Sequence, residues 1–211
     1  MSTNYDVPVT TVLEVDDATT APQRPTQLAL GLLLFIGGVI GLIAAFTLTW
    51  DKLEILKNPD YVPNCDVGSF ISCSNIMKSA QAEVFGFPNP LIGLMAFPFV
   101  IFMGVLVLSK VRLPELIWSG FQVGVILGAV FVHWLIYQSL FEIKFLCPYC
   151  MVVWAMVTPI FFYVTRRNLQ AWAPGSGVTR FLTNWHGLIV SLWFVAVAGG
   201  IVLRFSDTIF A

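Results

Sequence analysis

The chain has 211 residues, of which 57% are hydrophobic and only 11% are charged, and its formal net charge is -1. Soluble domains carry roughly 25% charged residues, so this composition and a mean hydropathy of +0.83 indicate an integral membrane protein. The small net charge argues against the strongly basic surface of a nucleic-acid-binding protein, and no nucleic-acid partner is expected.

The N-terminal segment, residues 1–27, is polar and rich in Ser, Thr, Asp and Pro, which predicts a disordered tail. It lacks the basic start and short apolar core of a signal peptide. An apolar run over residues 28–50 follows. Because about 20 residues cross a bilayer core, this run predicts the first membrane-spanning helix, with Trp50 as an anchor at the interface.

A polar connection, residues 51–90, holds two of the four cysteines, Cys65 and Cys73. Between about residues 74 and 85, apolar side chains recur at helical spacing and indicate a short amphipathic helix. Gly86 and Pro88 would end it. This helix is too short to span a membrane, so we expect it to lie in the interface.

Four further apolar runs predict spanning helices. They cover residues 91–109, 116–137, 147–164 and 186–203, and the main polar breaks between them are Lys110–Arg112, residues 138–146 and residues 168–184. The expected fold is therefore all-α: a membrane domain over residues 28–205 with five transmembrane helices, followed by a short outer tail, residues 206–211.

The orientation is predicted from the basic residues at the helix ends. Lys110–Arg112 and Arg166–Arg167 flank predicted spans directly, and the positive-inside rule places such residues in the cytoplasm. We expect a multi-pass membrane protein with its N-terminus in the cytoplasm. The polar connection 51–90 and the segment 138–150 then face outward, which brings all four cysteines to the oxidising side.

The other two cysteines form the motif Cys147-Pro148-Tyr149-Cys150 at the start of the fourth span. A thiol in a first helical turn faces unpaired N–H groups and the positive end of the helix dipole, which favour the reactive thiolate. Four outward cysteines fit two structural disulfides, a four-thiolate zinc site or a thiol relay. A Cys-x-x-Cys bridge closes too small a loop to stabilise a fold much, and a seven-residue spacing is unusual for zinc, so the relay is favoured.

In a relay, each cysteine pair would serve a different reactant. A soluble protein would reach Cys65 and Cys73 on their polar loop, whereas a lipid-soluble acceptor would reach Cys147 and Cys150 at a membrane helix. Quinones are the obvious membrane-borne acceptors of two electrons, although the spacing of the cysteines does not itself specify one.

These features together resemble the vitamin K epoxide reductase family, particularly its bacterial members. The resemblance rests on Cys65-x7-Cys73, on Ser79 six residues later, on Asn89 before Gly93, and on Cys147-x-x-Cys150 at the start of the fourth span. It extends from about residue 28 to residue 164 and loosely through the fifth span. In the DsbB type of disulfide-generating oxidase the Cys-x-x-Cys pair comes first, so the order found here favours the vitamin K epoxide reductase type.

The resemblance implies a protein of the bacterial cytoplasmic (inner) membrane. It also implies a four-helix bundle around a quinone, either menaquinone or ubiquinone, with the fifth helix peripheral. It implies that Cys147 and Cys150 are the active-site pair and that Cys150 lies nearer the quinone. Cys65 and Cys73 would shuttle electrons to this pair through a Cys73–Cys147 mixed disulfide.

Four further residues are candidates for the site. By the resemblance, Asn89 would hydrogen-bond a quinone carbonyl and Ser79 would order the loop, but the two also suit a helix N-cap and a polar helix face. Trp154 stands four residues after Cys150, where vertebrate relatives have Tyr; its indole N–H donates but does not accept, so quinone contacts should differ. Lys144 would stabilise a thiolate or a quinol anion, or merely reach for the interface.

The expected function is that of an enzyme, a membrane thiol oxidase. It would take electrons from a thioredoxin-fold, DsbA-like protein on the outer face and pass them to the membrane quinone pool, which supports disulfide formation. Few residues follow the fifth span, so the partner is expected to be a separate protein. The alternatives are reduction of vitamin K epoxide or quinone as the main activity, and a non-enzymatic membrane protein with structural or zinc-binding cysteines.

Two features inside the spans lie outside these motifs. His133 in the third span is expected to be a neutral, hydrogen-bonded residue rather than a functional one. The first span contains several glycines, including Gly38 and Gly41, which indicate close packing against another helix.

Overall fold

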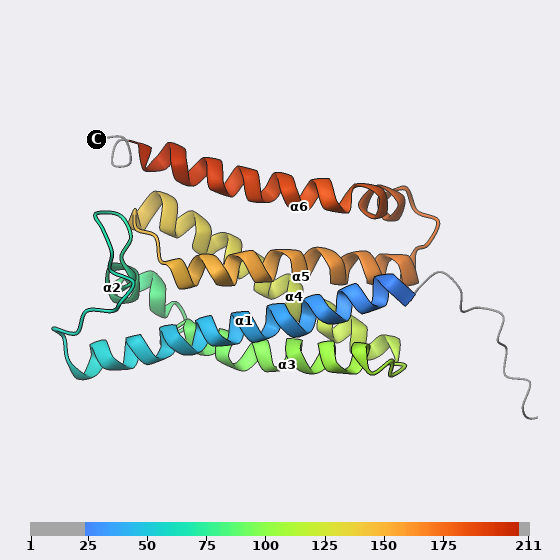
Figure 1. Cartoon of the computed structure of the whole chain (residues 1–211), viewed down its shortest axis with the longest axis horizontal. Helices are drawn as coiled ribbons and strands as arrows, with labels where there is room; N and C mark the ends of the chain where they lie inside the picture. The colour runs from blue at the N-terminus through green and yellow to red at the C-terminus, as the bar shows by residue number, and fades with distance from the viewer. Residues whose placement is uncertain (1–23, 207–211) are drawn as a thin grey trace, which may run out of the picture.

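The computed structural model describes residues 24–206, which form long helices and a few short helical turns (Figure 1). The elements are α1 (Arg24–Lys57), α2 (Cys73–Lys78), η2 (Ala80–Glu83), α3 (Pro90–Leu108), α4 (Glu115–Tyr137), η3 (Gln138–Ile143), α5 (Pro148–Trp172) and α6 (Gly177–Arg204). Among the described residues, five helices are long and apolar enough to cross a membrane. This confirms the predicted all-α membrane fold.

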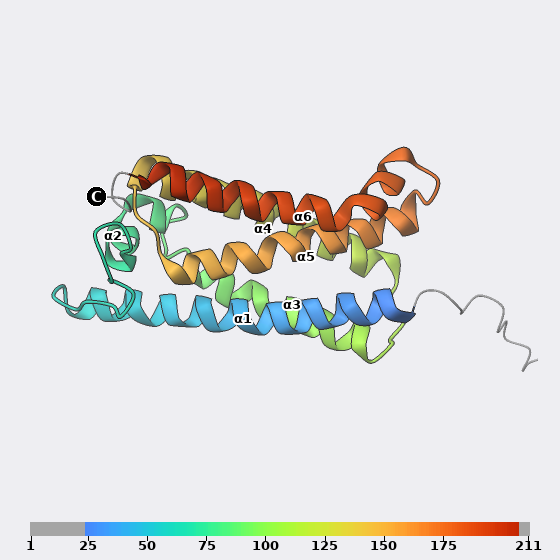
Figure 2. The same cartoon turned by 45° about the horizontal axis from the view of Figure 1, so that its top comes forward.

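Four of the long helices form a bundle, and the fifth lies on its outside. α1 packs along α3 and against α5, and α5 also packs against α4. α6 lies on the far side of α5 from α1 in both views (Figures 1 and 2). Within α6, whose residues are all described, Thr179 is the buried residue. The predicted four-helix bundle with a peripheral fifth helix is therefore confirmed.

Glycines bring α1 and α3 into close contact. A Cβ added to Gly41 would lie 2.2 Å from the ring of Phe97, and one added to Gly104 would lie 2.6 Å from the backbone nitrogen of Phe35. A side chain at Gly104 would push the two helices apart, and one at Gly41 would displace the ring of Phe97. The structure thus supports the packing interpretation of the glycines in the first span.

The spanning helices extend beyond the predicted apolar runs. α1 begins at Arg24, inside the segment predicted to be disordered, whose residues 1–23 lie outside the described part. It continues to Lys57 because Ile55 is buried beneath the loop that follows. α5 passes Arg166–Arg167 and ends at Trp172, and α6 starts at Gly177, so most of the predicted linker 168–184 is helical. Of the predicted outer tail, only its first residue is described.

The predicted interfacial helix over residues 74–85 is broken in two. Ser79 adopts an extended backbone, and its N–H and its hydroxyl both donate to the carbonyl of Ile76. These bonds end α2, and a short 3-10 turn, η2, follows. The prediction of one continuous helix was therefore wrong, because Ser79 competes with the helical hydrogen-bond pattern.

The predicted link over residues 138–146 is also mostly helical. It continues α4 as a π-helical turn, η3, which ends at Lys144 in a left-handed conformation with φ of 60°. The next residues turn back toward the loop, and Leu146 forms a parallel bridge with Ile71. This turn places the start of α5 directly beside the loop that carries Cys73.

Candidate active site

The loop cysteines form a buried disulfide. Cys65 and Cys73 are joined, with their Cα atoms 5.8 Å apart, and are 5% and 0% exposed. Cys73 is the first residue of α2, and the Ser72 hydroxyl before it accepts the N–H of Asn75, because Ser is a favoured N-cap residue. The oxidised loop is therefore fixed in place by a capped helix at one of its two sulfurs.

A carboxylate beside the disulfide orders the loop further. Asp66 accepts hydrogen bonds from the backbone N–H and the hydroxyl of Ser74. Burial alone would raise the pKa of Asp66, but the hydrogen bonds from Ser74, Ser72 and the N–H of Cys73 together hold it below its usual value. Asp66 therefore stays ionised and keeps its bonds to α2 at neutral pH.

The second pair, Cys147 and Cys150, is in the dithiol form. Cys147 is the N-cap residue of α5, its sulfur accepts the N–H of Cys150 at 3.4 Å, and Pro148 occupies the first turn, where no N–H is needed. The Cys150 thiol and the backbone N–H groups of Cys150 and Tyr149 hold the pKa of Cys147 below its ordinary value, although burial acts in the opposite direction. The helix start thus favours a thiolate at Cys147.

The two pairs meet at Cys73 and Cys147. Their Sγ atoms are 3.1 Å apart. The residues just before them are paired through the backbone: the N–H of Ser72 donates to the carbonyl of Leu146 at 2.9 Å, and the N–H of Leu146 donates to the carbonyl of Phe70 at 2.8 Å. A thiol in contact with a disulfide sulfur is the arrangement that thiol–disulfide exchange needs.

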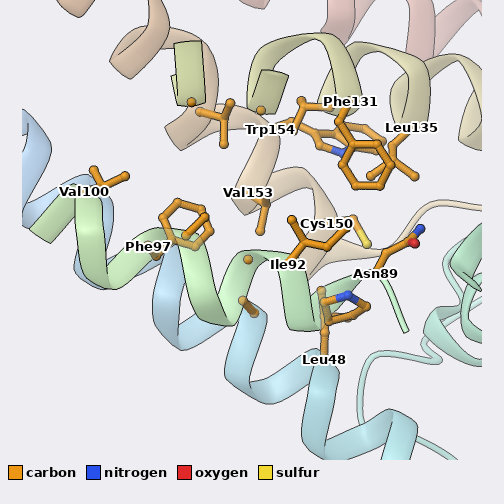
Figure 3. A pocket seen from close by; sticks show the side chains of 18 of the residues that line it. Leu48, Asn89, Ile92, Phe97, Val100, Phe131, Leu135, Cys150, Val153 and Trp154 are labelled. Atoms are coloured by element: carbon orange, nitrogen blue, oxygen red, sulfur yellow. The ribbon is translucent and has the colours of Figure 1, made fainter. Parts of the chain in front are cut away.

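A cavity of about 600 Å³ lies within the four-helix bundle and is lined mainly by apolar side chains (Figure 3). Of the four cysteines, all of which the structure describes, Cys150 is the one that lines it. Its other walls include Leu48, Ile92, Phe97, Phe131, Val153 and Trp154. The volume and apolar lining are typical of a site for an apolar small molecule, and the free thiol of Cys150 lies at its wall.

Asn89 supplies a polar group to this cavity. It is 8% exposed, its Nδ2 donates to the carbonyl of Gln81 at 2.7 Å, and its Oδ1 is buried with no hydrogen-bond partner. Although Asn89 occupies the N-cap position of α3, its side chain makes no capping bond. One amide hydrogen and Oδ1 remain for a ligand. A quinone fits them, because its carbonyls accept and the hydroxyls of its reduced form donate.

The other three candidate residues lie in different surroundings. Ser79 lines the cavity, but its hydroxyl is engaged with the carbonyl of Ile76 at 2.6 Å. Trp154 is 3% exposed and also lines the cavity. Lys144 is exposed at the end of η3 and is not among the described lining residues. The structure therefore brings Ser79 and Trp154, but not Lys144, to the cavity with Asn89 and Cys150.

The cation at the cavity is Lys52, which lies in α1 although residues 51–90 were predicted to be a polar connection. It is 7% exposed; its ammonium donates to the carbonyl of Met77 at 2.6 Å and pairs with Glu83 at 2.7 Å. It lines the cavity and joins α1 to α2 and η2. The signal that could have identified it is the spacing of Leu48, Lys52 and Ile55, which share one face of a continued helix.

His133 is hydrogen-bonded on both ring nitrogens. Its Nδ1 lies 2.8 Å from the carbonyl of Ala129, and its Nε2 accepts the indole N–H of Trp193 at 2.9 Å. This is the neutral tautomer with the proton on Nδ1. His133 thus links α4 to α6, which agrees with the structural role expected for it.

A family comparison agrees with the geometry. The model of the vitamin K epoxide reductase family matches residues 32–165, which is more than half of the 211 residues and includes all four cysteines. Membership of this family implies redox chemistry between disulfides and quinones in membranes, and the contact between the cysteine pairs and the apolar cavity are both compatible with it. The resemblance of the sequence is thereby confirmed, and the chain belongs to the vitamin K epoxide reductase family.

Proposed function

We propose that the protein is a thiol oxidase of the bacterial cytoplasmic membrane that reoxidises a separate thioredoxin-fold protein, similar to DsbA, on the outer face. Electrons pass through the two cysteine pairs to menaquinone or ubiquinone, with the N-terminus cytoplasmic. The observation that carries the proposal is the 3.1 Å contact between Cys73 and Cys147, with Cys150 lining the cavity.

The first step of the proposed route takes place at the loop. A partner thiolate attacks Cys65, the Cys65–Cys73 bond breaks, and Cys73 leaves as a thiolate. The second thiol of the partner then attacks the mixed disulfide, so the partner leaves oxidised and Cys65 becomes a thiolate. Because Cys65 is only 5% exposed, the loop has to open for this attack.

The second step moves the electron pair inward. The Cys73 thiolate attacks Cys147 of an oxidised Cys147–Cys150 pair, forms the Cys73–Cys147 bond and releases Cys150 as a thiolate. Cys65 then attacks Cys73, which restores the loop disulfide and releases Cys147. The lowered pKa of Cys147 makes it a good leaving group in this last exchange. The resulting state, an oxidised loop and a reduced inner pair, is the one in the structure.

The cavity provides the place for the acceptor. A bound quinone supplies the capacity to take up two electrons and two protons when Cys147 and Cys150 close to a disulfide. Asn89 would hold its polar head beside Cys150, while the apolar walls exclude water and accept its hydrocarbon parts.

The test is quinone reduction by the purified protein in lipid vesicles, with a reduced thioredoxin-fold protein as the donor. The wild type should form quinol, and Cys150→Ser should form none while still binding the partner. If Cys150→Ser reduces quinone at the wild-type rate, the proposed route is wrong. Offering vitamin K epoxide in place of quinone, with the same donor, distinguishes the alternative in which epoxide reduction is the main activity.

The non-enzymatic alternative in which the cysteines bind zinc requires a different arrangement of the four sulfurs. A four-thiolate zinc site needs all four sulfurs free, whereas Cys65 and Cys73 are joined. Within residues 24–206, no cluster of three or more His, Cys, Asp or Glu side chains is arranged to hold a metal ion. Metal analysis of the purified protein tests this alternative directly: stoichiometric zinc that is lost in Cys147→Ser would establish it.

A further inference from the structure

The C-terminal end of α6 contacts the segments that carry the cysteines, although the rest of this helix is peripheral. It lies at the same end of the bundle as α2 (Figure 1). The Nε of Arg204 donates to the carbonyl of Leu140 in η3 at 3.0 Å. The ring of Phe205, which is 5% exposed, stacks on Phe70 of the loop with centroids 5.1 Å apart. One helix end therefore contacts both segments that meet near the sulfurs.

These two contacts lie close to the reacting sulfurs. The backbone carbonyl of Phe70 accepts the N–H of Leu146, and Phe70 stands three residues before Cys73 in the chain. Leu140 belongs to the turn that leads to Cys147, and the Ser139 hydroxyl tightens that turn by donating to the carbonyl of Phe145 at 2.5 Å. Arg204 and Phe205 thus hold the two sides of the backbone pairing that aligns the sulfurs.

The pairing itself has little support of its own. It is an isolated bridge between Ile71 and Leu146, with two backbone hydrogen bonds and no neighbouring strand among the described residues. Even two-stranded pairing is marginal without a packed face. Phe205 contributes to that face, because it packs on Phe70 and in a buried cluster with Leu140 and Leu146.

We propose that Arg204 and Phe205 are positioning residues for the exchange between Cys73 and Cys147. They act through Phe70 and Leu140, and they keep the loop sulfur in line with the sulfur at the start of α5. This inference rests on the relay proposed above. It gives α6, which lines neither the cavity nor the disulfide, a part in the rate of electron transfer.

The direct test measures the formation of the Cys73–Cys147 bond. In a Cys65→Ser, Cys150→Ser background these are the two cysteines that remain, and diamide oxidises them to the cross-linked form. Adding Arg204→Ala or Phe205→Leu should slow cross-linking about ten- to hundredfold, since misplacement by about 1 Å costs rates of that order. Phe205→Tyr keeps the stacked ring and should restore the rate. Leu203→Ala, on an 80% exposed neighbour, should leave it unchanged.

A second measurement separates positioning from general stability. In a Cys65→Ala, Cys73→Ala background, dithiothreitol has to reduce the inner pair directly, so Arg204→Ala and Phe205→Leu should leave quinone reduction unchanged. With all four cysteines and a protein donor, the same substitutions should lower it about tenfold or more. Equal losses in both backgrounds, or unchanged cross-linking, would overturn the inference. If the wild type reduces no quinone, the relay itself fails, whereas the cross-linking result still decides the role of α6.

Discussion

The two ends of the bundle are held together in different ways. At the cysteine end, α2, η2 and η3 are short, and they depend on an isolated backbone bridge, a disulfide and the buried Lys52. Each of these attachments is small, and the disulfide is broken in the proposed reaction. We therefore expect the cysteine end to rearrange more easily than the rest of the bundle.

The opposite end is a dense network of side chains between α4 and α5. Arg167 binds both carboxylate oxygens of Glu115, at 3.0 and 3.1 Å, and lies 4.0 Å from the ring centroid of Trp118. Trp172 donates to the same carboxylate. Asn168, fully buried, donates to Gln122 at 2.8 Å. Such a bidentate, stacked arrangement fixes its partners firmly.

The difference suits the proposed reaction, in which one part of a small bundle stays fixed and the loop opens. The network at the far end would keep α4 and α5 together while the loop opens for the proposed partner. Substitutions at the cysteine end should therefore change rates, and those at the far end should change stability.

The largest effect is expected from Cys65→Ser. With a protein donor, quinone reduction should fall at least about hundredfold, because the entry disulfide is lost. With dithiothreitol the loss should be much smaller, since a small dithiol reduces the inner pair without the loop. Rates with both donors, measured in the same vesicles, check this. Equal losses would show that Cys65 does not act as a shuttle.

A smaller effect is expected from Lys52→Met. Without the ammonium, Met77 and Glu83 lose their bond to α1, and the short helices loosen over the cavity. The KM for quinone should rise roughly tenfold, which corresponds to the about 1.5 kcal/mol of one hydrogen bond to a charged group. Lys52→Arg should largely preserve the KM, and Lys57→Met, at an exposed position on the same helix, is the matched control. An unchanged KM would show that Lys52 does not contribute to quinone binding.

At the far end, Asn168→Ala should lower stability without lowering activity. It leaves the buried Gln122 oxygen without its donor, at a cost of about 2 kcal/mol. Thermal unfolding in detergent measures the loss, and turnover per folded molecule should stay at the wild-type value. The exposed Gln170→Ala on α5 is the control. A loss of turnover in Asn168→Ala would contradict the division of roles between the two ends.

The smallest effect is expected in the titration of Cys147. Because its folded pKa is lowered, the thiolate should persist as pH falls below about 8.5, the ordinary value for cysteine, and should protonate only through the lowered pKa. Thiolate ultraviolet absorbance against pH measures this, with Cys147→Ser as the blank. Cys150→Ala should move the midpoint upward, since it removes the main hydrogen bond to the thiolate. A midpoint at or above the ordinary value would show that the helix start does not activate Cys147.

The sequence predicted the five membrane spans well, because the length of an apolar run is a local property. The spacing of the cysteines is local too, and it indicated the family. The cation at the cavity was not indicated by the sequence: Lys144, the lysine named as a candidate, is exposed, whereas Lys52 lines the cavity where the loop after α1 packs back over that helix. The break at Ser79 and the contacts of Arg204 likewise depend on residues far away in the chain or on competing hydrogen bonds. Such features follow from the packing of the whole bundle.

The lengths of α1 and α3 bear on how far the cysteine pairs lie from the bilayer core. α3 has 19 residues and is about 28 Å long, close to the roughly 30 Å of a bilayer core. α1 has 34 residues and measures about 51 Å, so it is longer than a bilayer core is thick, and its C-terminal turns lead into the loop that carries Cys65 and Cys73. In the proposed orientation, a protein in the aqueous phase would meet this loop without entering the membrane. Inserting or deleting one turn at the C-terminal end of α1 would change its reach without altering either cysteine pair.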